Sequence, residues 1–124
     1  MSYGPNTYGS LAFSSSALTI TIGPITAVTM LCPSFDMESF GAGDTMNVSV
    51  QRLQQDGTTY EEIDNFTLST PVVIAAAPGQ GYIPQPQLDY YDNPYGGLKF
   101  VCTYTLGTGN SAYPSVYYDV TAGF

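Results

Sequence analysis

The chain has 124 residues, enough for a single domain with a sizeable core that needs no disulfide or metal to hold it together. Ten acidic residues against one Arg, one Lys and no His give a net charge of −8, which argues against nucleic acid and anionic membrane surfaces as partners. Because only 10% of the residues are charged, neutral polar side chains and tyrosine must cover much of the surface.

The first stretch of the chain, residues 1–14, is rich in Gly, Pro, Asn, Ser and Tyr and shows little periodicity. This composition is typical of an arm that becomes ordered only when something holds it. We therefore predict an extended N-terminal arm over residues 1–14 and a folded domain over residues 15–124.

The beginning of the chain does not have the pattern of an export signal. The stretch "MSYGPNTYGS" lacks a basic start, and the later run "ALTITIGPITAVTMLC" is interrupted by Gly23-Pro24 and contains several threonines. We expect the chain to fold in a cytosol, where Cys32 and Cys102 stay reduced. Their separation in the sequence still permits a disulfide if the protein meets an oxidant.

Strand patterns begin after the predicted arm. Leu18, Ile20 and Ile22 alternate with threonines, and a second β-branched run, "ITAVTML", covers residues 25–31. Gly-Pro makes a poor tight hairpin, so Gly23-Pro24 predicts a bend or bulge at which a strand changes its partner or its sheet.

The strongest local pattern is a hairpin around Asp56-Gly57. This dipeptide supplies the positive φ that a two-residue primed turn needs between two β runs. A turn at that point predicts three cross-strand pairs, namely Leu53 with Tyr60, Arg52 with Glu61, and Val50 with Ile63.

The remaining runs complete an all-β pattern. Residues 71–77 form a short apolar run that is compatible with a buried strand, and residues 98–106 alternate with Leu98, Phe100, Cys102, Tyr104 and Leu106 on one face. Residues 115–124 repeat the alternation with Val116, Tyr118 and Val120 inward, and residues 107–114 are expected to close a second hairpin. Seven or eight short strands without helical periodicity predict a single antiparallel β-sandwich, Ig-like or jelly-roll-like. The absence of Trp and of Ig-type Cys spacing argues against a true immunoglobulin domain.

Several chemistries lack their residues in this chain. Without His there is no Ser-His-Asp triad, no imidazole metal site and no histidine acid-base relay. Cys32 has no His partner, and Cys102 lies on the apolar face of its predicted strand, so we expect both to be inert thiols. One Lys and one Arg cannot build a phosphate cradle. We expect no enzymatic activity and no cofactor.

Carboxylates allow two interpretations. One group, Asp36, Glu38 and Asp44, flanks a Gly-Ala-Gly turn, and another, Asp89 and Asp92, flanks a tyrosine pair, so either could offer oxygens to Ca²⁺. Neither group matches a known ligand spacing, and we expect solvated loop acids with no metal. The acids near Arg52 indicate a charged strand edge that resists aggregation, and they comprise Glu61, Glu62 and Asp64.

Tyrosine carries the most information about function. The chain has eleven tyrosines, a side chain favoured at protein interfaces. Tyr104 and Tyr118 are in phase with apolar neighbours and are expected in the core. The segment "GYIPQPQLDYYDNPYGG", residues 81–97, is too rich in proline for a central strand and too long for an ordinary connection.

We therefore predict that this segment and the arm contact another chain. Tyr91 and Tyr95 are the foremost candidates, because "YDNPYGG" has the composition of a turn-rich tip. The full set of predicted contact residues is Tyr3, Tyr8, Tyr82, Tyr90, Tyr91 and Tyr95.

A small acidic β chain that starts "MSYGPNTYGS", carries a "DGTTYEE" hairpin and contains neither His nor Trp resembles small structural proteins of tailed bacteriophages. Among these it looks most like capsid decoration or cement proteins. The resemblance implies a non-enzymatic virion protein that folds in the host cytoplasm, forms a homo-oligomer, often a trimer, and binds the major capsid protein or another virion protein at capsomer junctions.

Other functions stay open at the level of the sequence. A head-tail or tail component would share the same composition. A carbohydrate-binding module could use tyrosine platforms and loop acids, although the absence of Trp argues against it. A glycosidase could use a pair among the ten acids, but nothing in the sequence selects one pair.

Overall fold

The computed structural model describes residues 7–36, 39–69 and 90–123. These residues form strands, turns and loops, and none of them belongs to a helix long and apolar enough to cross a membrane. The strands are β1 (Thr7–Ala12), β2 (Thr19–Ile25), β3 (Met30–Asp36), β4 (Thr45–Leu53), β5 (Tyr60–Ser69), β6 (Leu98–Thr105) and β7 (Ser115–Gly123).

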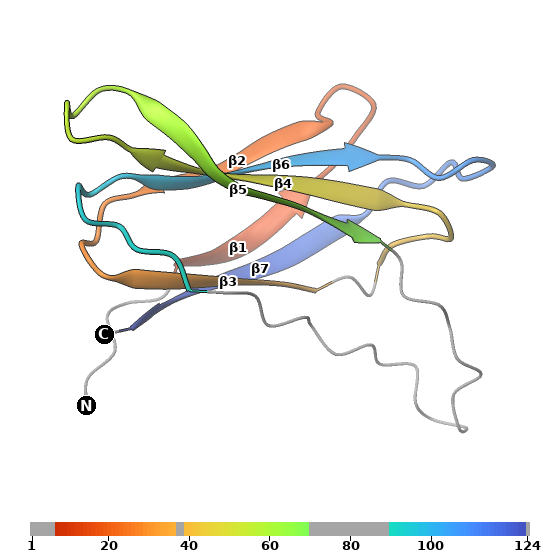
Figure 1. Ribbon diagram of the computed structural model, residues 1–124. Helices are drawn as coiled ribbons and strands as arrows, with labels where there is room; N and C mark the ends of the chain where they lie inside the picture. Colours follow the sequence, from red (N-terminus) through yellow and green to blue (C-terminus); the bar gives the residue numbers. More distant parts are fainter. Residues whose placement is uncertain (1–6, 37–38, 70–89, 124) are drawn as a thin grey trace.

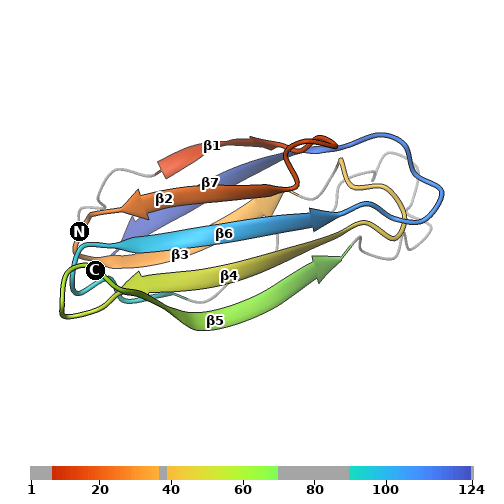
Figure 2. The same ribbon diagram turned by 90° about the horizontal axis from the view of Figure 1, so that it is seen from above.

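The strands form two antiparallel sheets that pack face to face (Figure 1). One sheet has the order β1-β7-β3 and the other the order β2-β6-β4-β5. Figure 2 looks down on the four-stranded sheet, with the three-stranded sheet behind it. The prediction of a single antiparallel β-sandwich is confirmed.

Strand pairs are nested along the chain. β1 pairs with β7, β2 with β6, and β4 with β5, so the described strands follow the path of one long hairpin rolled into two layers. The edge of β3 meets Tyr91, which lies between β5 and β6, through two main-chain hydrogen bonds between Leu31 and Tyr91 of 2.9 and 2.8 Å. This nesting is typical of a jelly roll.

The core lies between the two sheets. It follows from the period of two along each strand, which turns alternate side chains inward. On β6, for example, Leu98, Phe100, Cys102 and Tyr104 are buried, as predicted. They meet residues of the opposite sheet, whose buried members are Leu11, Leu31, Phe35, Val116, Val120 and Ala122.

The predicted irregularity at Gly23-Pro24 is present. The register of β2 against β6 shifts between Ile22 and Ile25, and Gly23 has a φ of +100°. A Cβ on Gly23 would lie 2.9 Å from the main-chain oxygen of Leu98, so a side chain here would be both strained and crowded. The predicted second strand at residues 25–31 is displaced, since residues 26–29 cross to the other sheet and β3 runs from Met30 to Asp36.

The β4–β5 hairpin confirms most of the predicted register. Leu53 pairs with Tyr60 and Arg52 with Glu61, but a register shift after Val50 makes its partner Asp64, so the predicted pair with Ile63 is wrong. The two-residue primed turn is also wrong. Of its two central residues only Gly57 has a positive φ, +78°.

A longer turn closes this hairpin. Gly57 N–H donates to the carbonyl of Gln54 over 3.0 Å, and Gln54 N–H donates to the carbonyl of Thr59 over 2.8 Å. The Asp56 carboxylate accepts the N–H groups of Thr58 and Thr59, both at 2.9 Å. The Thr59 hydroxyl also donates to this carboxylate over 2.6 Å, and this bond, together with the two main-chain bonds, lowers the pKa of Asp56 to about 2.

The boundary of the predicted arm is wrong for its described part. Residues 7–12 form β1, which pairs with β7 over six residue pairs. Leu11 is 2% exposed and Phe13 is 5% exposed, so both belong to the core. The polar residues around them conceal the alternation of these two apolar side chains.

Two other predictions concern the connections. Residues 107–114 join β6 of one sheet to β7 of the other, so the predicted second hairpin is wrong. Such a segment looks like a hairpin loop in the sequence, because local composition does not say in which sheet the next strand pairs. The predicted strand at residues 71–77 lies outside the described residues.

Candidate functional site

The outward side of β1 and β7 carries two large exposed aromatic side chains. Tyr8 is 78% exposed and Tyr117 is 63% exposed, while their strand neighbours Leu11 and Val116 are buried on the inward side. Alternation on a half-buried sheet explains this difference. We call this outward surface the β1–β7 face and define it by Tyr8, Ser10, Ala12, Ser115, Tyr117 and Asp119.

The register brings the main side chains of this face together. Tyr8 is the partner of Asp119, and Ser10 is the partner of Tyr117. Tyr8 and Tyr117 are therefore diagonal neighbours on adjacent strands, within reach of aromatic side chains, and Asp119 shares the strand with Tyr117 two residues away. The register thus places two tyrosines next to Asp119 on this face.

Asp119 has an unusual environment for a carboxylate. Its Oδ1 is buried and makes no hydrogen bond. The hydroxyl of Ser34 on β3 is close by, but it donates to the main-chain oxygen of Asp119 over 3.2 Å rather than to the carboxylate. An unsatisfied buried oxygen costs free energy, more so when the group is charged.

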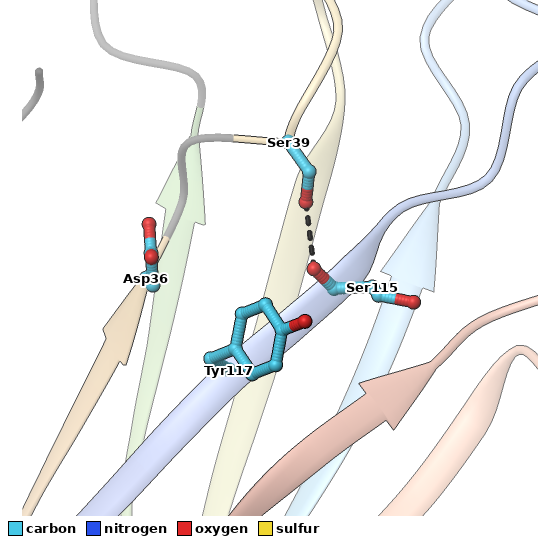
Figure 3. Close-up of a pocket in the computed structure, with 4 residues that line it drawn as sticks. All are labelled: Asp36, Ser39, Ser115 and Tyr117. Carbon is cyan, nitrogen blue, oxygen red and sulfur yellow. Dashed lines mark hydrogen bonds between the residues drawn. The ribbon is translucent and has the colours of Figure 1, made fainter.

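A small hollow borders the β1–β7 face at the end of β3 (Figure 3). Its volume is about 130 Å³, and its lining residues are Asp36, Ser39, Ser115 and Tyr117. The Ser39 hydroxyl donates to the Ser115 carbonyl over 2.7 Å, which ties the segment after β3 to the start of β7. The hollow is smaller than the pockets that enclose cofactors or drug-sized ligands, typically about 300 Å³ or more.

The structure divides the predicted contact tyrosines. Tyr8 is exposed on β1, and Tyr90 and Tyr95 are each 48% exposed in the segment before β6. Tyr95 precedes Gly96, which lies near Val28 of the β2–β3 connection, and Val28 is itself 70% exposed. Two further predicted contacts lie outside the described residues, namely Tyr3 and Tyr82.

Tyr91 has a role in the fold, and its predicted contact with another chain stays a prediction. Its ring packs edge-to-face against Phe100 with centroids 6.2 Å apart, and its hydroxyl donates to the Asp64 carboxylate over 2.6 Å. Its main chain pairs with Leu31. The sequence places Tyr91 in a turn-rich tip, but the edge of β3 binds it and turns it toward the sandwich.

The outward side of the four-stranded sheet differs from the β1–β7 face. Its polar side chains bond to one another across the strands. Asn47 donates to Asn65 over 2.7 Å and to Thr67 over 3.1 Å, and Ser49 donates to Glu62 over 2.6 Å. Bonds from Ser49 and Asn65 lower the pKa of Glu62. The acids predicted to form a charged strand edge are thus partly engaged in this network.

One of the predicted loop acids is buried. Asp44 is 1% exposed and accepts hydrogen bonds from the N–H groups of Gly41 and Gly107 and from the Asn110 amide, at 2.7 to 2.8 Å. Burial would raise the pKa of Asp44, but these bonds and the nearby Tyr104 hydroxyl outweigh it, so the pKa is lowered. Asp44 therefore joins the turn before β4 to the β6–β7 connection, and the prediction of a solvated loop acid is wrong for it.

The other predicted acids do not gather into a metal site in the described part of the chain. Asp36 borders the hollow, Asp92 is exposed, and Glu38 and Asp89 lie outside the described residues. Among residues 7–36, 39–69 and 90–123, no group of three or more His, Cys, Asp or Glu side chains is placed to hold a metal ion.

Both thiols are buried, and no disulfide joins them. Burial raises the pKa of Cys102 to about 12, so this thiol stays protonated and unreactive at neutral pH. The prediction of reduced, buried thiols agrees with the structure.

Sequence reasoning missed Tyr117 and Asp119 as surface residues of interest. The signal was present, because both are out of phase with the inward residues Val116, Tyr118 and Val120.

Comparisons with protein-family models, curated proteins and solved structures find no match to this chain.

Proposed function

We propose that this protein is a non-enzymatic structural component of a tailed-bacteriophage virion that binds and stabilises the assembled capsid shell through the β1–β7 face. The observation that carries the attachment surface is the exposure of Tyr8 and Tyr117 side by side on a sheet whose inner side is core. The choice of the capsid as the binding partner rests on the resemblance of the chain to decoration proteins.

Tyrosine suits such a surface. It brings a large apolar area at low conformational cost, and its hydroxyl keeps a hydrogen-bonding group at the contact. Neither Tyr8 nor Tyr117 is part of the core cluster, whereas Tyr104 belongs to it and Tyr113 packs edge-to-face against Tyr104. Two large aromatic side chains at neighbouring positions on one exposed sheet face form the kind of surface that a protein partner covers.

The winding of the strands supports the proposal without deciding it. Jelly rolls occur in viral capsid proteins and in lectins, and a fold alone does not assign a function. The proposed partner is the major capsid protein or another virion protein. The loop patch, defined as Val28 and Tyr95, offers a second surface through which sister subunits could form the proposed homo-oligomer, with a trimer favoured.

Cosedimentation tests the proposal. Purified protein is mixed with shells of the same virus assembled without it, and the bound fraction is measured over a range of concentrations. We expect the wild-type protein to bind and the double variant Tyr8→Ser, Tyr117→Ser to bind at least about 30-fold more weakly, because one such anchor contributes about 2 kcal/mol.

The matched control is Val101→Ser, Thr103→Ser on the outward side of β6, which should bind like the wild type. Circular dichroism and the melting temperature confirm that both variants fold. Failure of the wild-type protein to bind any shell would overturn the proposal, and specific binding on a glycan array would favour a carbohydrate-binding module instead.

A further inference from the structure

The two cations of the chain lie on the four-stranded sheet, away from the β1–β7 face. Arg52 on β4 pairs with Glu61 on β5, and the Nζ of Lys99 on β6 lies 4.2 Å from the centre of the Tyr60 ring. The whole chain contains no other Lys or Arg and no His. The β1–β7 face therefore carries carboxylate charge with no cation of its own to balance it.

The carboxylate at the centre of this face is incompletely satisfied. Asp119 lies on β7, the middle strand of its sheet, and its Oδ1 has no hydrogen-bond partner. The side chain as a whole is only partly buried. Because the charge is shared by both oxygens, a cation on the open side of the carboxylate would offset it.

The two tyrosine rings narrow the kind of cation. Tyr8 lies across from Asp119 and Tyr117 lies two residues along the same strand, so both residues are near enough in register for their rings to reach a cation held by the carboxylate. A guanidinium group is planar, so it can donate to the open side of the carboxylate and also stack on an aromatic ring. An ammonium group offers a point charge without the planar match, and a divalent metal would need more oxygens than one carboxylate and two phenols supply.

We infer that the β1–β7 face docks a basic segment of its protein partner, with an arginine guanidinium against Asp119 and the rings of Tyr8 and Tyr117. This inference rests on the proposed attachment function and states the chemistry of the partner surface. The charge of −8 adds long-range attraction to a basic partner, so association is faster at low ionic strength.

The test uses an acetylated hexa-arginine peptide as the probe and hexalysine as its charge-matched comparison. Binding to the isotopically labelled full chain is followed by amide chemical shifts at low ionic strength. We expect shifts gathered on β1 and β7, tighter binding of hexa-arginine than of hexalysine, and weakening of both by added salt.

Two variants that each remove one negative charge separate the site from general attraction. Asp119→Asn removes the proposed partner of the guanidinium, and Glu61→Gln removes an exposed acid from β5 on the other sheet. We expect Asp119→Asn to weaken hexa-arginine binding about tenfold and Glu61→Gln to weaken it less than twofold. Tyr117→Leu, which keeps an apolar side chain, should also weaken hexa-arginine more than hexalysine.

Equal effects of Asp119→Asn and Glu61→Gln, or shifts gathered on β4 and β5, would overturn the inference. Its failure is distinguishable from failure of the proposed function. Shell binding that depends on Tyr8 and Tyr117, combined with no arginine binding at this face, leaves the attachment function standing and removes only the basic partner. Arginine binding at this face without any shell binding would instead overturn the proposed capsid-binding function and leave the arginine site standing.

Discussion

The two outward faces of the sandwich use their side chains in opposite ways. On the four-stranded sheet, Asn47, Ser49 and their neighbours bond to one another across the strands, so these polar side chains find hydrogen-bond partners within the chain. On the three-stranded sheet, Tyr8 and Tyr117 point into solvent and the Asp119 carboxylate has an oxygen without a partner. A surface whose polar groups bond within the chain can therefore be distinguished from one that leaves polar and aromatic groups open to a partner, even before any partner is known.

The largest expected effect tests whether β1, which carries part of the β1–β7 face, is an integral strand of the fold. Leu11→Ala empties a buried position on the inner side of β1 and should lower the free energy of unfolding by about 2 to 5 kcal/mol. Ala12→Ser, one residue away on the outward side, should change it by less than about 0.5 kcal/mol. Urea denaturation measures both values, and similar small effects would mean that β1 is only loosely attached.

A second prediction concerns Asp44, which joins the turn before β4 to the β6–β7 connection. Asp44→Asn replaces a buried carboxylate that accepts two main-chain N–H groups and the Asn110 amide, and should cost about 2 to 3 kcal/mol. Because the folded-state pKa of Asp44 is lowered, its contribution is complete above the ordinary value of 3.8 and is lost as the pH falls below it. Wild-type stability should therefore fall in this acid range more steeply than that of Asp44→Asn. Parallel pH profiles for the two proteins would contradict the assignment.

The third prediction separates a tyrosine of the fold from a tyrosine of the face. Tyr91→Phe loses the hydroxyl bond to the Asp64 carboxylate and should cost about 1.5 kcal/mol. Tyr117→Phe should leave the free energy of unfolding within about 0.5 kcal/mol of the wild type, since Tyr117 is mostly exposed. Thermal denaturation compares the two, and a reversed order would show that the assignment of these tyrosines is wrong.

The smallest expected effect probes the polar network itself. Asn47→Ala removes bonds to Asn65 and Thr67 and should cost about 1 kcal/mol. Ser10→Ala on the β1–β7 face should have no measurable effect, because Ser10 is exposed and truncation there uncovers little. Equal free energies of unfolding for the two variants would mean that the side-chain hydrogen bonds of the four-stranded sheet add no measurable stability.

The sequence alone predicts the layers of this fold because alternation is a local property. The inward set on β6 and the pairs Leu53–Tyr60 and Arg52–Glu61 follow from a period of two and one glycine-containing turn. The partner of Val50 could not be predicted in the same way. A register shift after this residue comes from packing against the neighbouring strands, and no residue in the sequence marks it.

Long-range pairing explains the remaining errors. β1 is predicted as an arm because only Leu11 and Phe13 show its inward face, and its partner β7 lies about a hundred positions further along the chain. The place of Tyr91 depends in the same way on a distant edge, that of β3. For the candidate site, the sequence predicts tyrosine as the contact residue and includes Tyr8, which the structure shows to be exposed. The pairing of strands is needed to add Tyr117 and Asp119.

The nested order of the strands also has a consequence for synthesis. A ribosome makes β1 before all the other described strands and β7 after them, yet these two are partners, and β7 is also the neighbour of β3. The β4–β5 hairpin can form as soon as it leaves the ribosome, whereas the three-stranded sheet must wait for its middle strand. A chain interrupted before β7 would thus lack both Tyr117 and the strand that pairs with β1, so the proposed attachment face would exist only in finished molecules.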